Sequence, residues 1–393
     1  MTAHEREGAM DLEPMFEPIA IGPLTLRNRF VMPGMQREWC VDGAPTARLA
    51  EYYRRRAAGG TALINSEACA VDHPTSTQSS QFTWLTERTA PAWARCAAAV
   101  RGEGAEFFIQ LWHEGAVREE GGAGPYAHHP TLSPSGLLSG DEPRGRAMTG
   151  AELGEIEAAF VRSALLAKSI GASGVEVHAC HGYLLDQFLW GATNRRDDGY
   201  GGDDIRDRVR FPAQVVAAIR AAVGPDFAVS LRFSQWKEID YRARIAQTPD
   251  ELRIFIETFE AAGVDMFHAS TRRFWTPEWP ELDADLGLAG WVKKFTDLPV
   301  AAVGSLGLAT DVMTSLDGGP ARQTGRPSFR ELLRRFERGD FDLMTVGRAQ
   351  IADPEWVAKV RRDAIEELLP FDERVAAREL EDFDEPTRAA RHD

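Results

Sequence analysis

Short apolar runs alternate with longer amphipathic stretches over most of the 393-residue chain. Eight of these runs have the length and composition typical of buried strands. They cover residues 30–32, 62–66, 106–111, 174–178, 227–232, 266–269, 299–304 and 343–347. Between them, apolar positions recur at helical spacing in segments 151–170, 207–223, 250–262 and 329–338. Eight apolar strands that alternate with helices predict an α/β fold, a parallel sheet closed into a single (β/α)8 barrel.

The main alternative architecture is an open, doubly wound sheet. Such a sheet usually carries a glycine-rich dinucleotide fingerprint directly after its first strand. Here the first strand is followed by Pro33-Gly34-Met35-Gln36, which is not that motif, and the chain contains no GxxxxGK sequence. The sequence therefore favours the barrel and argues against a nucleoside-triphosphate loop.

Two connections are too long for simple strand-to-helix turns. Residues 112–150, after the third strand, are rich in Gly, Pro and His, and residues 309–327 interrupt the seventh unit. A long loop over a barrel mouth is often functional, so we expect 112–150 to cap the barrel, whereas 309–327 is as well explained by a surface insertion. We place the barrel domain at 15–371, an N-terminal extension at 1–14 and a charged C-terminal tail at 372–393.

Composition narrows the class of partner. The chain has 45 Lys and Arg against 60 Asp and Glu, a net charge of −15, which argues against binding to nucleic acid or anionic lipid. No apolar window reaches the ~18 residues of a membrane-spanning helix, and no secretory signal is visible. The four cysteines are widely spaced, which predicts a reducing compartment and no disulfide framework. Together these features predict a soluble cytoplasmic protein, and a homo-oligomer stays open.

Polar residues gather at the carboxyl ends of the expected strands, where barrels carry their active sites. Carboxylates are scarce there, which argues against glycoside hydrolysis and magnesium-dependent enolase chemistry, since both need acidic groups. The strand-end residues are Met35, Gln36, Glu67, Ala68, Gln110, His113, His178, His181, Arg232, Gly304, Ser305, Gly347 and Arg348.

The strongest local signal is the pair His178 and His181, followed by Tyr183. Two imidazoles at this spacing could bind zinc, with His113 or His268 as a third ligand. They could also be structural, or they could donate hydrogen bonds to one ligand oxygen. We favour the third interpretation and expect no metal.

The last two strands suggest a phosphate site. Gly304-Ser305 and Gly347-Arg348 end neighbouring strands, and glycine allows backbone N–H groups to approach a phosphate while arginine adds a charge-assisted contact. Barrels often bind phosphate after strands seven and eight. Arg232 ends the fifth strand and indicates an anionic ligand, because few acids accompany it.

These motifs resemble the Old Yellow Enzyme family of FMN-dependent NAD(P)H oxidoreductases over residues 15–357. The most specific segments are residues 178–189, which read HACHGYLLDQFL, and 193–202, which read TNRRDDGYGG. Supporting segments are 26–32, 110–113 and 346–354. Some related enzymes add an iron–sulfur region and a dinucleotide-binding region. This chain is shorter and lacks their cysteine cluster, so we expect neither region here.

The resemblance implies a role for each strand-end residue. Gln110 would bind the flavin pyrimidine, Arg232 would lie near N1 and O2, and Ala68 would pass close to the ring. Gly304, Ser305, Gly347 and Arg348 would hold the phosphate. His178 and His181 would bind a carbonyl or nitro oxygen of the substrate, and Tyr183 would donate the proton, with Tyr126 as its main competitor.

One segment departs from the family pattern. The family usually reads Ala-Pro-Met and then Thr or Cys after the first strand, where Pro33-Gly34-Met35-Gln36 stands here. The larger Gln36 would change the flavin potential and the pocket shape. The implied activity is an ene-reductase with tightly bound, non-covalent FMN, which takes hydride from NADH or NADPH and reduces enones or nitro compounds. The rivals are a flavin-free lyase or isomerase acting on a phosphorylated substrate and a non-catalytic phosphate-ligand binder.

Overall fold

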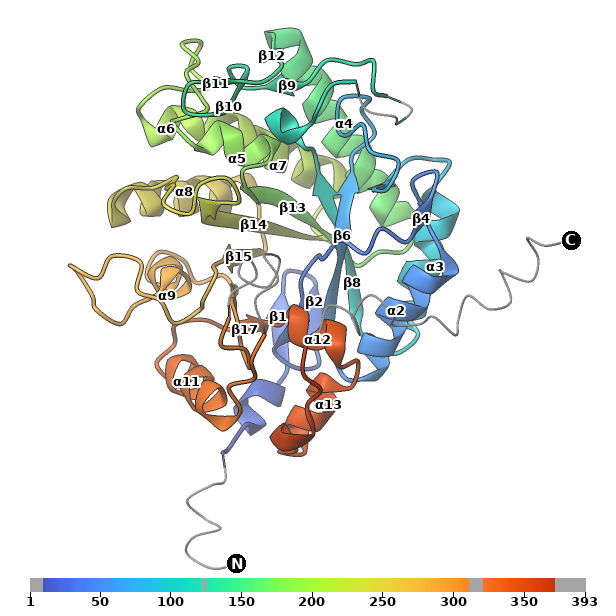
Figure 1. Cartoon of the computed structure of the whole chain (residues 1–393), viewed down its shortest axis with the longest axis vertical. Coiled ribbons are helices and arrows are strands. Elements are labelled where there is room, and N and C mark those ends of the chain that lie inside the picture. The colour runs from blue at the N-terminus through green and yellow to red at the C-terminus, as the bar shows by residue number, and fades with distance from the viewer. Residues whose placement is uncertain (1–9, 122–123, 125, 311–320, 372–393) are drawn as a thin grey trace, which may run out of the picture.

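The computed structural model describes residues 10–121, 124, 126–310 and 321–371. Its centre is a closed barrel of eight parallel strands, because β3 pairs with both β17 and β6 (Figure 1). This confirms the predicted (β/α)8 fold. The strands are β3 (Phe30–Met32), β6 (Leu63–Ala70), β8 (Glu106–Trp112), β13 (Gly174–His181), β14 (Ala228–Lys237), β15 (Met266–Ser270), β16 (Val300–Val303) and β17 (Leu343–Thr345).

Helices surround the barrel, and each presents an apolar face to it (Figure 1). The segment predicted at 207–223 is divided at Val209 into α6 and α7, and α11 begins three residues before the predicted 329 because Pro327 suits the first helical turn. The helices are α2 (Ala47–Ala58), α3 (Ala90–Arg101), α4 (Gly150–Ser169), α5 (Leu184–Leu189), α6 (Ile205–Arg208), α7 (Arg210–Val223), α8 (Pro249–Ala262), α9 (Leu288–Lys293), α11 (Arg326–Glu337), α12 (Arg348–Ala352) and α13 (Trp356–Arg361).

Three strands extend three or more residues beyond their predicted ends. β6 continues to Ala70, β13 to His181 and β14 to Lys237. Polar residues interrupt the apolar pattern in each extension, Glu67 in β6, His181 in β13 and Ser234-Gln235 in β14, yet all ten residues of β14 are buried. Buried polar side chains at the ends of these strands face partners inside the barrel mouth, so the chain continues there as strand.

A short hairpin closes the amino-terminal end of the barrel. Strands β1 (Ile19–Ile21) and β2 (Leu24–Leu26) pair antiparallel. Ile21 and Leu26 pack with Val31, Leu63 and Phe108, which belong to barrel strands. Burial of these side chains closes that end of the barrel and leaves the carboxyl ends of the strands to form a cavity.

The predicted capping loop after β8 has structure of its own. Strand β9 (Leu132–Ser133) pairs with β12 (Arg146–Ala147), and β10 (Leu137–Ser139) pairs with β11 (Glu142–Pro143), beside α5 and α6 at the top of Figure 1. The buried guanidinium of Arg118 donates to the backbone carbonyls of Tyr126 and His129 and holds the segment together. The remaining short elements are η1 (Glu13–Phe16), β4 (Cys40–Val41), β5 (Ala44–Pro45), β7 (Thr83–Trp84), η2 (Gly115–Val117) and η3 (Ile365–Glu367).

The predicted tail 372–393, residues 1–9 of the predicted N-terminal extension and residues 311–320 of the second long connection lie outside the described residues. Within the part that is described, no helix combines the length and apolar character needed to cross a bilayer.

Candidate active site

One cavity of about 910 Å³ opens at the carboxyl ends of the barrel strands. Its volume falls in the range of ~300–1,000 Å³ that is typical of small-molecule sites. Every residue that the sequence analysis assigned to a cofactor or to catalysis lines it. These residues are Pro33, Gly34, Met35, Gln36, Ala68, Gln110, His178, His181, Tyr183, Arg232, Gly304, Ser305, Gly347 and Arg348.

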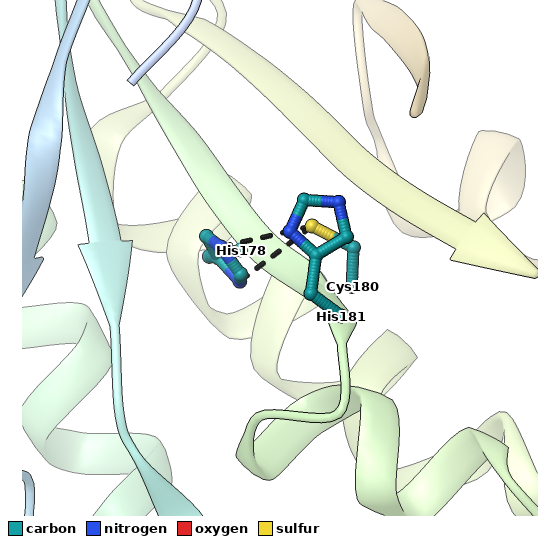
Figure 2. A group of neighbouring side chains, drawn as sticks. All are labelled: His178, Cys180 and His181. Atoms are coloured by element: carbon teal, nitrogen blue, oxygen red, sulfur yellow. Dashed lines mark hydrogen bonds between the residues drawn. The ribbon is translucent and has the colours of Figure 1, made fainter. Parts of the chain in front are cut away.

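His178 and His181 lie in the last four residues of β13. Their ring centroids are 5.7 Å apart, and the Cys180 sulfur lies beside them (Figure 2). Burial and the nearby Arg232 charge lower the pKa of His178 to about 3. Burial and the same guanidinium also lower the pKa of His181 well below its ordinary value. Both imidazoles are therefore neutral near pH ~7, so each can donate one hydrogen bond without carrying charge.

The hydrogen bonds around Ser270 indicate which nitrogen of His181 carries the proton. Ser270 Oγ lies 2.9 Å from His181 Nε2 and accepts from Arg232 Nη2 at 3.2 Å. Because guanidinium can only donate, the Ser270 hydroxyl is available to donate to His181 Nε2. This arrangement favours the tautomer with the His181 proton on Nδ1, in which Nδ1 is the donor toward a ligand.

Tyr183 follows the two histidines at the start of α5. Its ring packs edge-on against Trp112 and His178, each at 5.2 Å between centroids, and its hydroxyl donates to Glu238 Oε2 at 3.3 Å. Burial, followed by the charges of Glu238 and Glu114, raises the pKa of Tyr183 well above 10. The phenol therefore keeps its proton at neutral pH.

A buried ion pair holds the turn between His181 and Tyr183. Asp186 Oδ2 accepts the Gly182 N–H at 2.6 Å, and Asp186 Oδ1 lies 2.7 Å from Lys237 Nζ. Neither charged side chain is exposed to solvent. His181 and Gly182 have φ of 64° and 97°, a left-handed conformation that costs a non-glycine residue about 1–3 kcal/mol. The ion pair keeps this strained turn, and with it Tyr183, against β14.

Gln110 is oriented by a carboxylate at the centre of the barrel. Gln110 Nε2 donates to Glu176 Oε1 at 2.7 Å, and His268 Nδ1 lies 2.7 Å from Glu176 Oε2. Burial opposes ionisation of Glu176, but His268, Arg232 and Gln110 together lower its pKa below the ordinary value. The amide of Gln110 is thus turned so that Oε1 remains as an acceptor on the cavity wall.

The part of the cavity between Gln110 and the loop after β3 contains buried polar atoms without protein partners. Arg232 Nε and both amide atoms of Gln36 have none. A side chain at position 34 would collide with the Ser66 carbonyl at 2.5 Å and the Gln110 amide at 2.8 Å. Orphaned buried polar atoms beside a position that only glycine can occupy indicate a wall that a polar ligand completes.

The ends of β16 and β17 form a second polar corner. Arg348 Nη2 donates to the Thr310 carbonyl at 2.6 Å and to Ser305 Oγ at 3.3 Å. Ser305 has φ of 57°, and a Cβ at Gly304 would lie 2.8 Å from the backbone nitrogens of Arg273 and Phe274. Backbone that approaches this closely, with a guanidinium beside it, has the chemistry of a phosphate seat.

Several sequence-based candidates do not reach the cavity wall. His113 is buried between Thr75 Oγ1 and the Gly115 N–H, and His268 is paired with Glu176. Neither can serve as the third zinc ligand considered above. The Tyr126 ring packs on Trp84 at 5.0 Å, and this tyrosine is not a cavity residue, so it is removed as a competitor for proton donation.

Glu67 is also enclosed in protein instead of lining the mouth. Its Oε2 accepts the Arg37 N–H at 2.8 Å, and burial raises its pKa to about 7. It therefore holds the backbone that follows Gln36.

The neighbour of the histidine pair is Cys180. One atom from each of His178, Cys180 and His181 lies within 4.8 Å of the others (Figure 2). Burial raises the pKa of the Cys180 thiol well above its ordinary value, and the thiol is a poor metal ligand compared with the thiolate. Hydrogen-bond donation by the two imidazoles remains the better interpretation.

Sequence reasoning missed four important cavity residues. Ser270 lies one position beyond a predicted strand end, so a longer strand would have included it. Trp236 stacks on His181 at 4.6 Å between centroids, but the predicted fifth strand stopped at 232. Glu38 and Glu238 also line the cavity, so the expectation that carboxylates are nearly absent from this mouth was wrong.

The fold and cavity agree with a comparison against known families. The sequence profile of the NADH:flavin oxidoreductase / NADH oxidase family matches residues 14–367. The chain belongs to this family. It is therefore a member of the Old Yellow Enzyme group, as the histidine-tyrosine motif implied.

Individual relatives place the chain within this family. It is 34% identical to an NADH oxidase of Thermoanaerobacter brockii over 90% of its own length and 52% of that protein. It is 29% identical to 12-oxophytodienoate reductase 7 of Oryza sativa subsp. japonica, covering 89% and 88%. Morphinone reductase in complex with tetrahydroNAD superposes with a TM-score of 0.75 at 25% identity, covering 92% and 93%. The chain thus spans about half the length of some curated relatives and most of others.

The cofactor of this Old Yellow Enzyme group is FMN, and the cavity suits it. The Gln110 acceptor and the unpartnered Arg232 Nε would meet the polar edge of the flavin, while Gly304, Ser305 and Arg348 would meet its phosphate. Gly34 and Ala68 also line this cavity.

We expect Arg348→Ala to weaken FMN binding, because a hydrogen bond to a charged group contributes about 1.5–3 kcal/mol, equivalent to about 10- to 150-fold in affinity. Titration of flavin-free protein with FMN, followed by flavin fluorescence, measures this change. Arg348→Lys should retain part of the affinity, and Arg330→Ala, on an exposed face of α11, should retain all of it. Unchanged FMN affinity in Arg348→Ala would show that the phosphate binds elsewhere.

Proposed function

We propose that this chain is an FMN-dependent ene-reductase, with its barrel domain at residues 15–371. Its substrates would be α,β-unsaturated carbonyl or nitro compounds, and NADH or NADPH would be the reductant. Bound FMN would supply the redox chemistry by accepting hydride from the nicotinamide and delivering it to the β-carbon of the acceptor. The proposal rests on one observation above all: two neutral imidazoles and a protonated phenol line the same cavity as the Gln110, Arg232 and Arg348 contacts.

The two histidines bind and polarise the acceptor oxygen. Each neutral ring presents one N–H, and for His181 the Ser270 hydrogen bond favours the tautomer in which that N–H is at Nδ1. Donors that are already in position stabilise the charge that develops on the oxygen as the C=C bond is reduced. Because neither ring is charged, the pair does not attract unrelated anions strongly, and these would not compete with the substrate oxygen.

Tyr183 supplies the proton at the α-carbon. Its ring contacts His178, so the hydroxyl lies on the same side of the cavity as the oxygen-binding pair. A phenol that remains protonated can act as a general acid without help from a positive charge.

The shape of the acceptor side favours flat substrates. Trp236 stacks against His181, Trp112 packs against Tyr183, and Phe82 packs on Trp112 at 5.3 Å. Aromatic walls of this kind bind planar unsaturated molecules through their faces. The names of the rice and morphinone relatives, both reductases, support the same reaction type. The cavity does not favour a flavin-free lyase or isomerase, because a phosphorylated metabolite would leave the Gln110 and Arg232 corner without a partner.

The four cysteines are all unbridged, in keeping with the proposed cytoplasmic location. No metal, nucleic acid or membrane partner forms part of the proposal.

The direct test follows the two half-reactions by stopped-flow absorbance of the yellow, FMN-loaded protein. We expect NADH or NADPH to bleach the flavin and 2-cyclohexen-1-one to restore its colour. A colourless protein that binds no FMN, or a flavin that no nicotinamide reduces, would refute the proposal.

His178→Ala and His181→Ala should weaken binding of a phenol ligand and slow enone reduction. A lost hydrogen bond of about 0.5–1.5 kcal/mol corresponds to a phenol dissociation constant raised about 2- to 10-fold. Phenol titration of the flavin absorbance measures it, with the exposed His128→Ala as the matched control. If stoichiometric zinc were lost together with activity on chelation, the histidines would be metal ligands instead.

A further inference from the structure

Glu238 is an acidic side chain that accepts a hydrogen bond from the proposed proton donor, Tyr183. It follows the last residue of β14 and lines the cavity. Its Oε2 lies 3.3 Å from the Tyr183 hydroxyl, and its backbone N–H donates to the His181 carbonyl. This backbone bond attaches Glu238 to the same strained turn that positions Tyr183. The two side chains are therefore held close to each other by the backbone as well as by their own contact.

Glu238 also remains exposed, whereas the Tyr183 ring is enclosed by Trp112 and His178. The carboxyl group therefore connects an enclosed phenol with solvent. The separation of 3.3 Å is long for an O–H···O hydrogen bond, but such contacts commonly shorten when substrate closes an active site.

Electrostatics restrict how Tyr183 can give up its proton. If Glu238 were ionised at that moment, the transfer would leave a phenolate beside a carboxylate, with Glu114 as a further acidic neighbour of Tyr183. Like charges in an enclosed site repel strongly, and desolvation makes each of them more costly. The charge of Arg232 acts on Glu238, but this guanidinium also faces Glu176 and Ser270.

We propose that Glu238 is a proton-relay residue that acts through Tyr183, so that enone reduction uses the protonated form of its carboxyl group. This inference rests on the proposed ene-reductase function. As the Tyr183 O–H proton forms the new C–H bond with the enolate electron pair at the α-carbon, the carbonyl C=O bond re-forms. In the same step the Glu238 O–H proton passes to the Tyr183 oxygen. The carboxylate that remains at Glu238 then takes a proton from water, and the electrons come from NAD(P)H.

The environment supports protonation of this carboxyl group. Although part of the Glu238 side chain is exposed, desolvation of its carboxyl group in the cavity raises the pKa of Glu238, and the hydrogen bond from Tyr183 and the charge of Arg232 only partly oppose the shift. As the pH rises through that raised pKa, Glu238 ionises and the relay is lost. The rate of the acceptor step should therefore fall on the alkaline side while Tyr183 itself is still protonated.

The test compares Glu238→Gln with the parent in stopped-flow oxidation of the reduced, FMN-loaded protein by 2-cyclohexen-1-one across pH. Glutamine retains the size and the hydrogen bond, but it neither ionises nor relays a proton. We expect the variant to be about 10-fold slower at low pH, less than the ~10²-fold or more for loss of the general acid itself, because Tyr183 remains and water can return its proton. Its rate should be flat with pH, so that at high pH, where the parent carries a carboxylate, the two profiles cross.

A crossing of the profiles is a signature that a purely structural role would not produce. Asp240→Asn changes a carboxyl group outside the cavity, two residues along the chain, and should follow the parent profile. Parallel profiles for Glu238→Gln and the parent would overturn the relay while leaving the reductase function in place. If Glu114→Gln, and not Glu238→Gln, abolished the fall in rate at high pH, Glu114 would be the carboxyl group responsible and the relay through Glu238 would be overturned. A reduced protein that no enone reoxidises would refute the proposed function itself.

Discussion

Tyr183→Phe is expected to slow enone reduction about 10²-fold or more, the usual scale for the loss of a general acid. The substitution removes one oxygen atom, and the ring contacts with Trp112 and His178 remain. FMN binding and flavin reduction by the nicotinamide should be nearly unchanged, because the hydroxyl takes no part in either. Stopped-flow oxidation of the reduced protein by 2-cyclohexen-1-one measures the affected step.

A nitroalkene separates hydride transfer from protonation in the same variant. The nitronate formed from β-nitrostyrene is stable without immediate protonation, so the oxidation of the flavin should be slowed much less than with the enone. Tyr126→Phe is the matched control, since that phenol lies outside the cavity and should leave both rates at the parental values. Equal slowing with the two acceptors, or none with the enone, would remove Tyr183 from the mechanism.

Lys237→Met is expected to lower the free energy of unfolding by about 3–5 kcal/mol, because it leaves the Asp186 carboxylate buried without its partner. The Lys237 ammonium also donates to the carbonyls of Ser234 and Gln235, so its loss leaves these acceptors unsatisfied. Urea denaturation of the FMN-loaded variant measures the change. Lys293→Met, which removes a partly exposed pair with Asp342, should cost at most about 1 kcal/mol.

The free energy of unfolding that Lys237→Met loses should become smaller as the pH falls. Burial raises the pKa of Asp186 to about 6, and removal of the neighbouring ammonium removes the group that opposes this rise. A carboxyl group whose pKa is raised in the folded state gains stability as the pH falls through that value, so the deficit should shrink between about pH 7.5 and about pH 5.5. The double variant Asp186→Asn/Lys237→Met should recover part of the stability at both pH values, since the asparagine oxygen can still accept the Gly182 N–H. A deficit that does not change with pH would show that Asp186 is not the unpaired charge.

The barrel could be predicted because its signal is local. Each buried strand is an apolar run and each helix has its own periodicity, so eight repeats of this pattern identify the architecture without any knowledge of contacts. The errors lie where polarity and burial disagree. β14 continues through Ser234, Gln235 and Lys237, which are buried because the barrel supplies partners, and an apolar pattern cannot reveal those partners.

The chain by itself determined the barrel, the strand-end glycines and part of the cavity lining, including His178, His181 and Tyr183. Strand ends converge in any closed barrel, so their position along the sequence is enough to bring them to one mouth. Only the tertiary structure decided how these residues act. The Ser270 contact that sets the His181 tautomer spans 89 positions, the Gln110–Glu176 contact spans 66, and the Tyr183–Glu238 contact spans 55. Such pairs depend on strand register and side-chain direction, and these are set by the packing of the whole barrel.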